Sequence, residues 1–194
     1  EASSMFIWHI MEHFLADKRN VRILDLCASP GGKSTLIAAF LNNNGLLVSN
    51  ELSKSRAYVL KYNVSKEGHS NVIVTNNDPK DFSQITEYFD LILVDAPCSG
   101  EGMFRKDPNA VFEWSTENVA KCVSRQKRIL ADVLPALKQD GLLLYSTCTY
   151  NRYENINNVQ WLTSEKNLIS IPVKTNKEWN IFEICDGANF GYQF

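Results

Sequence analysis

The stretch LDLCASPGGKST, residues 24–35, decides the fold. It leaves the apolar run 21–27 (VRILDLC), turns through Pro30-Gly31-Gly32 and enters a helix that carries Lys33. A glycine turn between a strand and a helix lets a ligand approach the backbone at the positive end of the helix dipole. The stretch therefore predicts a ligand-binding strand–turn–helix unit.

The same alternation of short apolar runs and helical patterns continues along the chain. Strands are expected at 21–27, 45–51, 71–75, 89–98 and 141–148, and helices at 5–15, 34–41, 53–66, 119–137 and 153–162. Gly141 is expected to terminate the long helix, and weaker strand patterns lie near 168–171 and 181–185. Apolar strands that alternate with helices predict a mostly parallel sheet with helices on both faces, here in one α/β domain over residues 1–194.

Composition excludes several classes of protein. The 194 residues carry a net charge of −2, so the chain is not a strongly basic nucleic-acid binder, although this does not exclude a local basic patch. No run of 18 apolar residues occurs, which argues against a membrane span. The N-terminus has no basic region before its apolar stretch and no initiator Met, so we expect no signal peptide and a piece of a longer protein.

Five cysteines are scattered without CxxC spacing, at Cys27, Cys98, Cys122, Cys148 and Cys185. An odd, scattered set argues against a disulfide framework and against a structural zinc site. We expect a reducing cytoplasm, no metal, and thiols available for chemistry. Cys122 and Cys185 are expected to be structural, and Cys27 to shape the loop.

Most reactive side chains fall at or just beyond the carboxyl ends of the predicted strands: Cys27, Glu51, Asp78, residues 95–98 and residues 146–148. In parallel α/β sheets, ligands bind beyond these ends. The sequence therefore predicts a single functional edge.

The loop in residues 24–35 does not match the triphosphate-binding loop called Walker A. Gly32-Lys33-Ser34 fits the end of a Walker A motif, but Cys27 replaces its first glycine, and no GxGxxG pattern occurs. Glu51 has the spacing of a ribose-binding acid, and Asp78 could accept a hydrogen bond from an adenine amino group, although each acid alone is more often a solvated strand end. Together they favour an adenosine ligand without polyphosphate, such as S-adenosylmethionine; a P-loop enzyme is the alternative.

Cys98 and Cys148 end adjacent predicted strands, in DAPCSGEG and YSTCTY. A thiolate that adds to C6 of cytosine makes C5 nucleophilic enough to take a methyl group. Asp95 could hydrogen-bond N3 and the exocyclic amine, and Lys33 could orient Asp95 or lower a cysteine pKa. The residues themselves leave open which cysteine is the nucleophile.

Four stretches resemble, in order and spacing, the motifs of the Nol/Nop/Sun family of RNA cytosine-C5 methyltransferases: DLCASPGGKST, NELSKSRAYVL, DAPCSGEGMFRKDP and YSTCTYNRYEN. The likeness covers about residues 1–165 and is greatest to the bacterial branch that acts on small-subunit ribosomal RNA. It implies a seven-stranded, Rossmann-like class I S-adenosylmethionine-dependent methyltransferase fold.

The resemblance also implies the roles of individual residues. Cys148 would be the nucleophile and Cys98 would assist product release, with Asp95 and Lys33 completing the catalytic set. The cofactor S-adenosylmethionine would contact Cys27, Ala28, Ser29, Pro30, Gly31, Gly32, Lys33, Glu51 (ribose), Arg56, Asp78 (adenine) and Asp95.

The expected partner is RNA, in particular 16S ribosomal RNA, bound by a monomer. The alternatives are the same chemistry on tRNA, or a non-catalytic RNA-binding or assembly module. The resemblance implies that an N-terminal RNA-binding region and the final strands lie outside this chain. A local basic rim is expected from Lys54, Arg56, Arg105, Lys106 and residues 125–128, with 105–108 (RKDP) as the better RNA contact.

Overall fold

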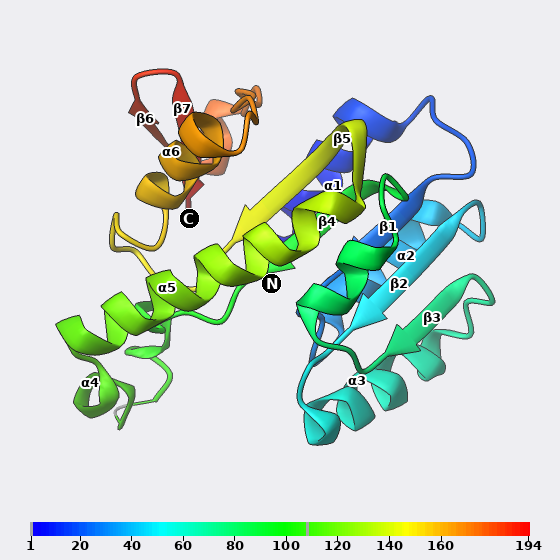
Figure 1. The fold of residues 1–194 in the computed structure, drawn as a ribbon, viewed down its shortest axis with the longest axis horizontal. Coiled ribbons are helices and arrows are strands. Elements are labelled where there is room, and N and C mark those ends of the chain that lie inside the picture. Colours follow the sequence, from blue (N-terminus) through cyan, green and yellow to red (C-terminus); the bar gives the residue numbers. More distant parts are fainter. Residues whose placement is uncertain (1, 108) are drawn as a thin grey trace. The chain divides into compact units, whose positions relative to one another are not determined.

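The computed structural model describes residues 2–107 and 109–194. The chain forms two compact units. The first contains Glu1–Ala96 and Ile129–Ser146, and the second contains Pro97–Arg128 and Thr147–Phe194. Figure 1 shows the ribbon of both units, coloured along the sequence.

The first unit is built on a parallel five-stranded sheet in the order β3-β2-β1-β4-β5. Its strands are β1 (Arg22–Asp25), β2 (Leu46–Asn50), β3 (Val72–Thr75), β4 (Phe89–Asp95) and β5 (Leu137–Ser146). The strand order reverses between β1 and β4, the position at which open α/β sheets bind ligands. The α/β class is therefore confirmed. Among the described residues this sheet has five strands, whereas the resemblance implies seven for the whole fold, and β6 and β7 form a separate two-stranded sheet.

Helices α1 (Ala2–Leu15) and α2 (Gly32–Leu41) bury one core with the sheet. Met11, Ile23, Ile37, Leu47 and Leu91 are completely buried there. Each such side chain contributes about 1.5–3 kcal/mol by leaving water. This packing fixes the position of the turn between β1 and α2. A smaller cluster packs helix α3 (Lys54–Glu67) against β3.

The end of helix α5 (Thr116–Val133) differs from the sequence prediction. The helix ends four residues early because Pro135 lacks the N–H that a helix interior needs, and Leu134–Ala136 form a 3₁₀ turn instead. Strand β5 then begins at Leu137. Gly141 is not a helix terminator; it lies in β5, where a Cβ would stand 2.9 Å from the Lys138 carbonyl oxygen.

The second unit contains a short helix α4 (Asn109–Glu113), the N-terminal part of α5, and helix α6 (Ile156–Glu165). Strands β6 (Phe182–Asp186) and β7 (Asn189–Gln193) form an antiparallel hairpin, and α6 contacts β7. The predicted strand near 181–185 is confirmed to within one residue. The one near 168–171 is wrong, since those residues form no strand, and β7 was not predicted.

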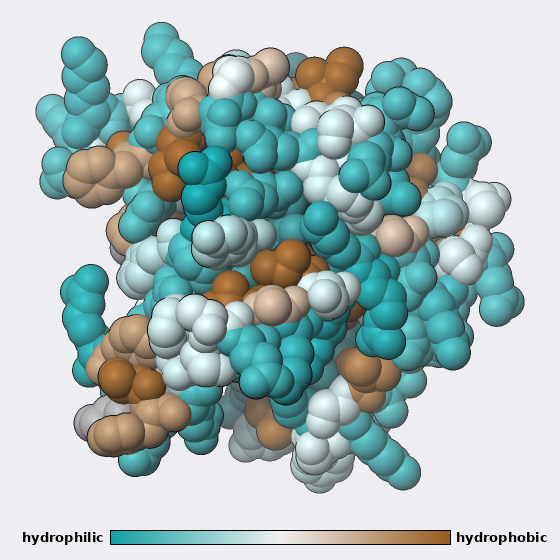
Figure 2. Space-filling view, turned by 60° about the vertical axis from the view of Figure 1, so that its left-hand side comes forward, coloured by the Kyte–Doolittle hydropathy of each residue, from teal (hydrophilic) through white to brown (hydrophobic). Residues whose placement is uncertain are grey.

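Within residues 2–107 and 109–194, no helix is long and apolar enough to cross a bilayer. On the face drawn in Figure 2, hydrophobic residues form separate small patches in a mostly hydrophilic surface. Isolated apolar side chains of this kind are normal on globular proteins.

Candidate active site

A cavity of about 380 Å³ opens beside the carboxyl end of β1 in the first unit. This volume is in the range of small-molecule sites. It is lined by most of the predicted loop together with Asp25, Leu36 and two residues of α1: Ser4, Met5, Asp25, Cys27, Ala28, Ser29, Pro30, Gly32, Lys33, Leu36 and Asp95. Gly31 is the N-cap of α2 at φ 117°, a conformation that favours glycine. A second cavity of about 440 Å³ lies along β2 and β3, has mostly apolar walls and contains none of the predicted catalytic residues.

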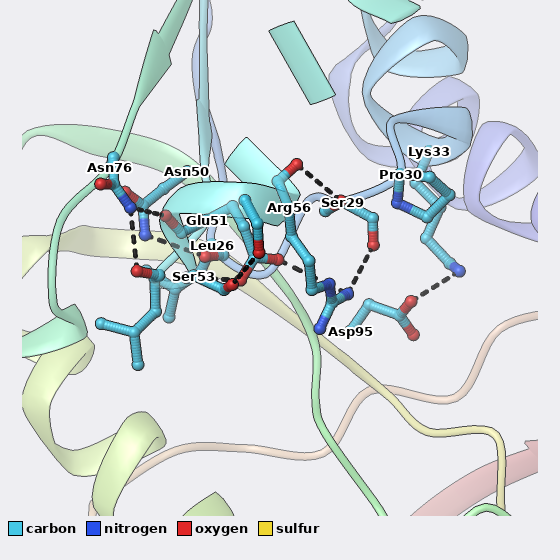
Figure 3. Close-up of polar contacts among 12 residues, drawn as sticks. Leu26, Ser29, Pro30, Lys33, Asn50, Glu51, Ser53, Arg56, Asn76 and Asp95 are labelled. Atoms are coloured by element: carbon cyan, nitrogen blue, oxygen red, sulfur yellow. Dashed lines mark hydrogen bonds and ion pairs between the residues drawn. The ribbon is translucent and has the colours of Figure 1, made fainter. Parts of the chain in front are cut away.

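Arg56 and Glu51 hold the loop in place (Figure 3). The Arg56 guanidinium donates to the Ser29 carbonyl at 2.9 Å and lies 3.5 Å from a Glu51 carboxylate oxygen. The Ser29 hydroxyl donates in return to the Arg56 carbonyl at 3.0 Å. Glu51 also accepts a hydrogen bond from the Ser53 N–H at 2.9 Å. Ser53 is the N-cap residue of α3, and its side chain makes no capping hydrogen bond. Two predicted cofactor residues therefore shape the loop from α3 and the end of β2.

Asn50 ties three strand ends together and was not predicted from the sequence. Its side chain is completely buried, donates to the Leu26 and Asn77 carbonyls, and accepts from the Thr75 hydroxyl and the Asn77 N–H. An amide has the donors and acceptors for this role, whereas the Glu51 that follows does not. Asn50 thereby fixes the ends of β1, β2 and the segment after β3.

Asp78 is already engaged locally. It is the N-cap of a 3₁₀ helix, Pro79–Gln84, where its carboxylate accepts from the Lys80 N–H at 3.1 Å and Asp81 returns a contact to the Asp78 N–H. The sequence DPKD carries this signal, since an Asp followed three residues later by an acidic residue is typical of a capping box. The structure thus gives Asp78 a structural role, and any contact with adenine would be additional.

Lys33 and Asp95 form an ion pair at the cavity, with 2.8 Å between Nζ and Oδ2 (Figure 3). The other Asp95 oxygen accepts from the Ser146 hydroxyl at 2.7 Å. Lys33 comes from the first turn of α2, and Asp95 and Ser146 end the paired strands β4 and β5. Lys33 is therefore in contact with Asp95, as the expected orienting role would require, and that role stays a prediction.

Asp25 was not predicted as a site residue from the sequence. It is completely buried at the end of β1, and its Oδ2 accepts from the Ser34 hydroxyl at 2.6 Å. Its Oδ1 has no hydrogen-bond partner among the described residues. Burial raises the pKa of Asp25 to about 7, against the lowering effect of the Ser34 hydrogen bond. Burial, with Asp25 and Glu51 nearby, also raises the pKa of Cys27 to about 12, so Cys27 stays a neutral thiol that lines the cavity.

Cys98 and Cys148 lie together in the second unit, with their Sγ atoms 3.1 Å apart. The Cys148 N–H also donates to the Cys98 Sγ at 3.3 Å. The pKa of Cys98 is raised, first by the hydrogen bond with Cys148 and then by burial, so at neutral pH Cys98 is a thiol that can donate to its neighbour. Cys148 is exposed and Cys98 is half-buried, which favours Cys148 as the atom that meets a substrate.

The expected basic rim lies mostly at the surface. Lys54, Arg56, Arg105, Lys106, Arg125 and Arg128 are exposed, and Arg56 also contacts the loop. Pro108, the last residue of the predicted RKDP contact, lies outside the described residues. Among the residues that the structure describes, no group of three His, Cys, Asp or Glu side chains could hold a metal ion. Cys122 is buried as expected, but Cys185 is exposed.

Comparisons with known proteins agree with this architecture. Residues 12–186 match the family model of the 16S rRNA methyltransferase RsmB/F. Ribosomal RNA small subunit methyltransferase F of Pectobacterium atrosepticum is 48% identical over 144 residues, which cover 74% of this chain and 30% of that protein.

Two solved structures share the fold. PH0851 superposes with a TM-score of 0.79 at 28% identity, over 86% of this chain and 38% of that one. NSun6 from Pyrococcus horikoshii, solved with SFG, has a TM-score of 0.69 at 29% identity, over 80% and 40% of the two chains. The chain spans about a third of the length of the curated relatives it matches. Because the family model covers most of the sequence, this chain belongs to the 16S rRNA methyltransferase RsmB/F family.

Proposed function

We propose that this chain is the catalytic part of an S-adenosylmethionine-dependent methyltransferase that forms 5-methylcytosine in 16S ribosomal RNA. The observation that carries the proposal is the Cys98–Cys148 pair, with 3.1 Å between its sulfur atoms. Two thiols at this distance suit a reaction that must both form and break a thioether. Membership of the RsmB/F family supports ribosomal RNA as the substrate, and reduced thiols fit a reducing cytoplasm.

In the proposed reaction, the Cys148 thiolate adds to C6 of the target cytosine. Asp95, held by Lys33 and Ser146, accepts a hydrogen bond from the exocyclic amine and shares a proton with N3, which stabilises the ring as it accepts electron density. S-adenosylmethionine supplies the methyl group that C5 takes up. Cys98 then assists the step in which the C5 proton leaves and Cys148 is expelled. The target base must be unpaired or flipped, because both faces of the C5–C6 bond have to be reached.

The cavity in the first unit supports binding of the methionine part of the cofactor, whereas Glu51, Arg56 and Asp78 do not line it. It joins the N-terminus of α2, a buried carboxylate oxygen of Asp25 without a hydrogen-bond partner among the described residues, and the Lys33–Asp95 pair. Residues 27–33 would border the methionine part, and Glu51, supported by Arg56, would meet the ribose. SFG in the archaeal NSun6 is an S-adenosylmethionine analogue, which supports the same ligand class here.

Methylation of ribosomal RNA by the purified chain tests the proposal. We expect tritium from S-adenosyl-[methyl-³H]methionine in unmodified 16S RNA, and bisulfite sequencing should place it at cytosine. Incorporation into tRNA instead would support the same chemistry on a different substrate. Cofactor binding without transfer, in this chain and in a longer protein that contains it, would favour the non-catalytic module.

Calorimetry separates the proposal from the P-loop alternative. S-adenosylhomocysteine should bind and ATP should not, because Cys27 occupies the first glycine position of the triphosphate loop. Binding of ATP alone would contradict the assignment of the cavity.

Lys33→Ala is expected to lower the rate of methyl transfer about a hundredfold, within the range of a lost acid–base or electrostatic group. The reason is that Asp95 loses the cation 2.8 Å away that orients it. The affinity for S-adenosylhomocysteine, measured by calorimetry, should change much less. Lys61→Ala, which alters an exposed lysine of α3 outside the expected basic rim, is the control and should leave both values unchanged. An equal loss of affinity and rate would show that Lys33 binds the cofactor instead.

A further inference from the structure

Two glutamates without a proposed catalytic role, Glu101 and Glu154, lie beside the Cys98–Cys148 pair. Glu101 follows Cys98 by three residues in the sequence. One of its carboxylate oxygens accepts from the backbone N–H groups of Tyr150 and Asn151, at 2.7 and 2.9 Å. The other accepts from the Trp114 indole N–H at 3.2 Å. Glu101, from the loop of one cysteine, therefore holds the backbone just after the other cysteine, Cys148.

Glu154 makes the reverse connection. It follows Cys148 by six residues, and one of its oxygens accepts from the Ser99 backbone N–H at 2.9 Å and from the Gln126 amide at 2.8 Å. Its other oxygen accepts from the Ser99 hydroxyl and from the Asn151 amide at 2.7 Å. Glu154 thus holds the residue next to Cys98, and its side chain is completely buried.

The loops meet through the backbone as well. The Gly102 N–H donates to the Cys148 carbonyl at 2.8 Å. A Cβ on Gly102 would stand 2.7 Å from that carbonyl oxygen, so only glycine permits the approach. The two loops are therefore in direct contact, and the carboxylates determine how they are aligned.

We propose that Glu101 and Glu154 are positioning residues, a reciprocal carboxylate brace that sets the distance between the Cys98 and Cys148 thiols. The proposal rests on the proposed function for its catalytic meaning, but the geometry stands without it. Carboxylates suit this position because they only accept, and each is surrounded by several N–H or O–H donors. For Glu101, burial raises the pKa, but the hydrogen bonds from Tyr150, Thr149 and Asn151 outweigh it and lower the pKa.

Glu154→Gln tests the brace with a change of a single group. Both oxygens of Glu154 accept hydrogen bonds, and in glutamine one of them becomes an NH₂ group that can only donate. In either orientation of the amide this NH₂ group faces another donor, so the contacts with Ser99 and Asn151 cannot all be kept. Glu101→Gln is milder, since its oxygen can keep the two backbone N–H groups, and only the longer contacts from the Trp114 and Asn151 side chains are lost. We therefore expect Glu154→Gln to disturb the alignment of the two cysteines more than Glu101→Gln does.

Disulfide trapping measures the thiol separation without RNA or cofactor. Diamide removes one hydrogen from each thiol as a single Sγ–Sγ bond forms, and mass spectrometry of the Cys98–Cys148 peptide pair gives the rate. We expect Glu154→Gln to slow this rate roughly tenfold, equivalent to ~1.4 kcal/mol, and Glu101→Gln to slow it less. Glu117→Gln changes the same atoms at an exposed site of α5 and should have no effect. Alkylation of the exposed Cys185 should be the same in every variant.

Methyl transfer supplies the second measurement. Both variants should lower kcat with little change in the KM for RNA, because the brace positions the thiols and does not bind substrate. A folded Glu154→Gln protein that cross-links at the wild-type rate would overturn the proposal. If circular dichroism shows that this variant is unfolded, Glu101→Gln decides, and an unchanged cross-linking rate there overturns it as well. Absence of methyl transfer both in the wild-type chain and in a longer protein that contains it would contradict the proposed function and leave the trapping result valid.

Discussion

Cys148→Ala is expected to abolish methyl transfer, with a loss of at least about 10⁴-fold, the scale seen when a covalent nucleophile is removed. The reason is chemical: without a thiolate at C6, C5 of cytosine is too weak a nucleophile to take the methyl group. The exposed position of Cys148 and the Cys98 thiol 3.1 Å away suit it for this role. The measurement is tritium transfer to unmodified 16S RNA, together with denaturing gels that reveal a protein–RNA adduct.

Cys98→Ala is the matched variant, since it removes one thiol from the same pair. It should still form the C6 thioether but should release product slowly, so a covalent adduct accumulates. Cys148→Ala should show no adduct. An adduct that persists in Cys148→Ala and disappears in Cys98→Ala would reverse the two roles, and an adduct in neither would exclude covalent catalysis. Cys122→Ala, a buried cysteine outside the pair, controls for the loss of a thiol.

The sheet could be predicted from the sequence because its strands are short, apolar runs separated by clear turns. The edge at which Lys33, Asp95 and Ser146 meet follows from that alternation, whereas the strand order was not predicted. The end of α5 could not be placed correctly because the apolar period continues past Val133, whereas the ring of Pro135 stops the helix. A local steric effect outweighed the hydrophobic pattern.

The residues that hold the site in place were harder to predict than the reactive side chains. Glu101 and the backbone that it holds are about 50 residues apart in the sequence, and Asn50 joins segments on three strands. Contacts of this kind depend on tertiary packing, and no local spacing indicates them. Asp25 is the clearest case, since a carboxylate inside an apolar run is interpreted as an ordinary strand residue until its burial is known.

Asp25→Asn is expected to remove a large pH dependence of stability. Burial raises the pKa of Asp25 from 3.8 to about 7. Between these values the unfolded chain has already lost the proton that the folded protein keeps, so stability falls as pH rises. The full change corresponds to about 4 kcal/mol, of which roughly 3 kcal/mol falls between pH 5 and pH 8. Above pH 7 the carboxyl is ionised in both states and the loss is constant.

The amide that Asp25→Asn introduces keeps an oxygen for the Ser34 hydroxyl and cannot ionise. Urea unfolding at pH 5 and pH 8 measures the free energy of unfolding of both proteins. The difference between the variant and the wild type should shift by about 3 kcal/mol in favour of the variant from pH 5 to pH 8. Asp140→Asn is the control, because Asp140 is exposed and its φ of 58° suits an asparagine equally well. If the free energies of unfolding of Asp25→Asn and the wild type differed by the same amount at both pH values, the buried carboxyl would titrate at its ordinary pKa. In that case the energetic cost of burying it must be offset by contacts other than the Ser34 hydrogen bond.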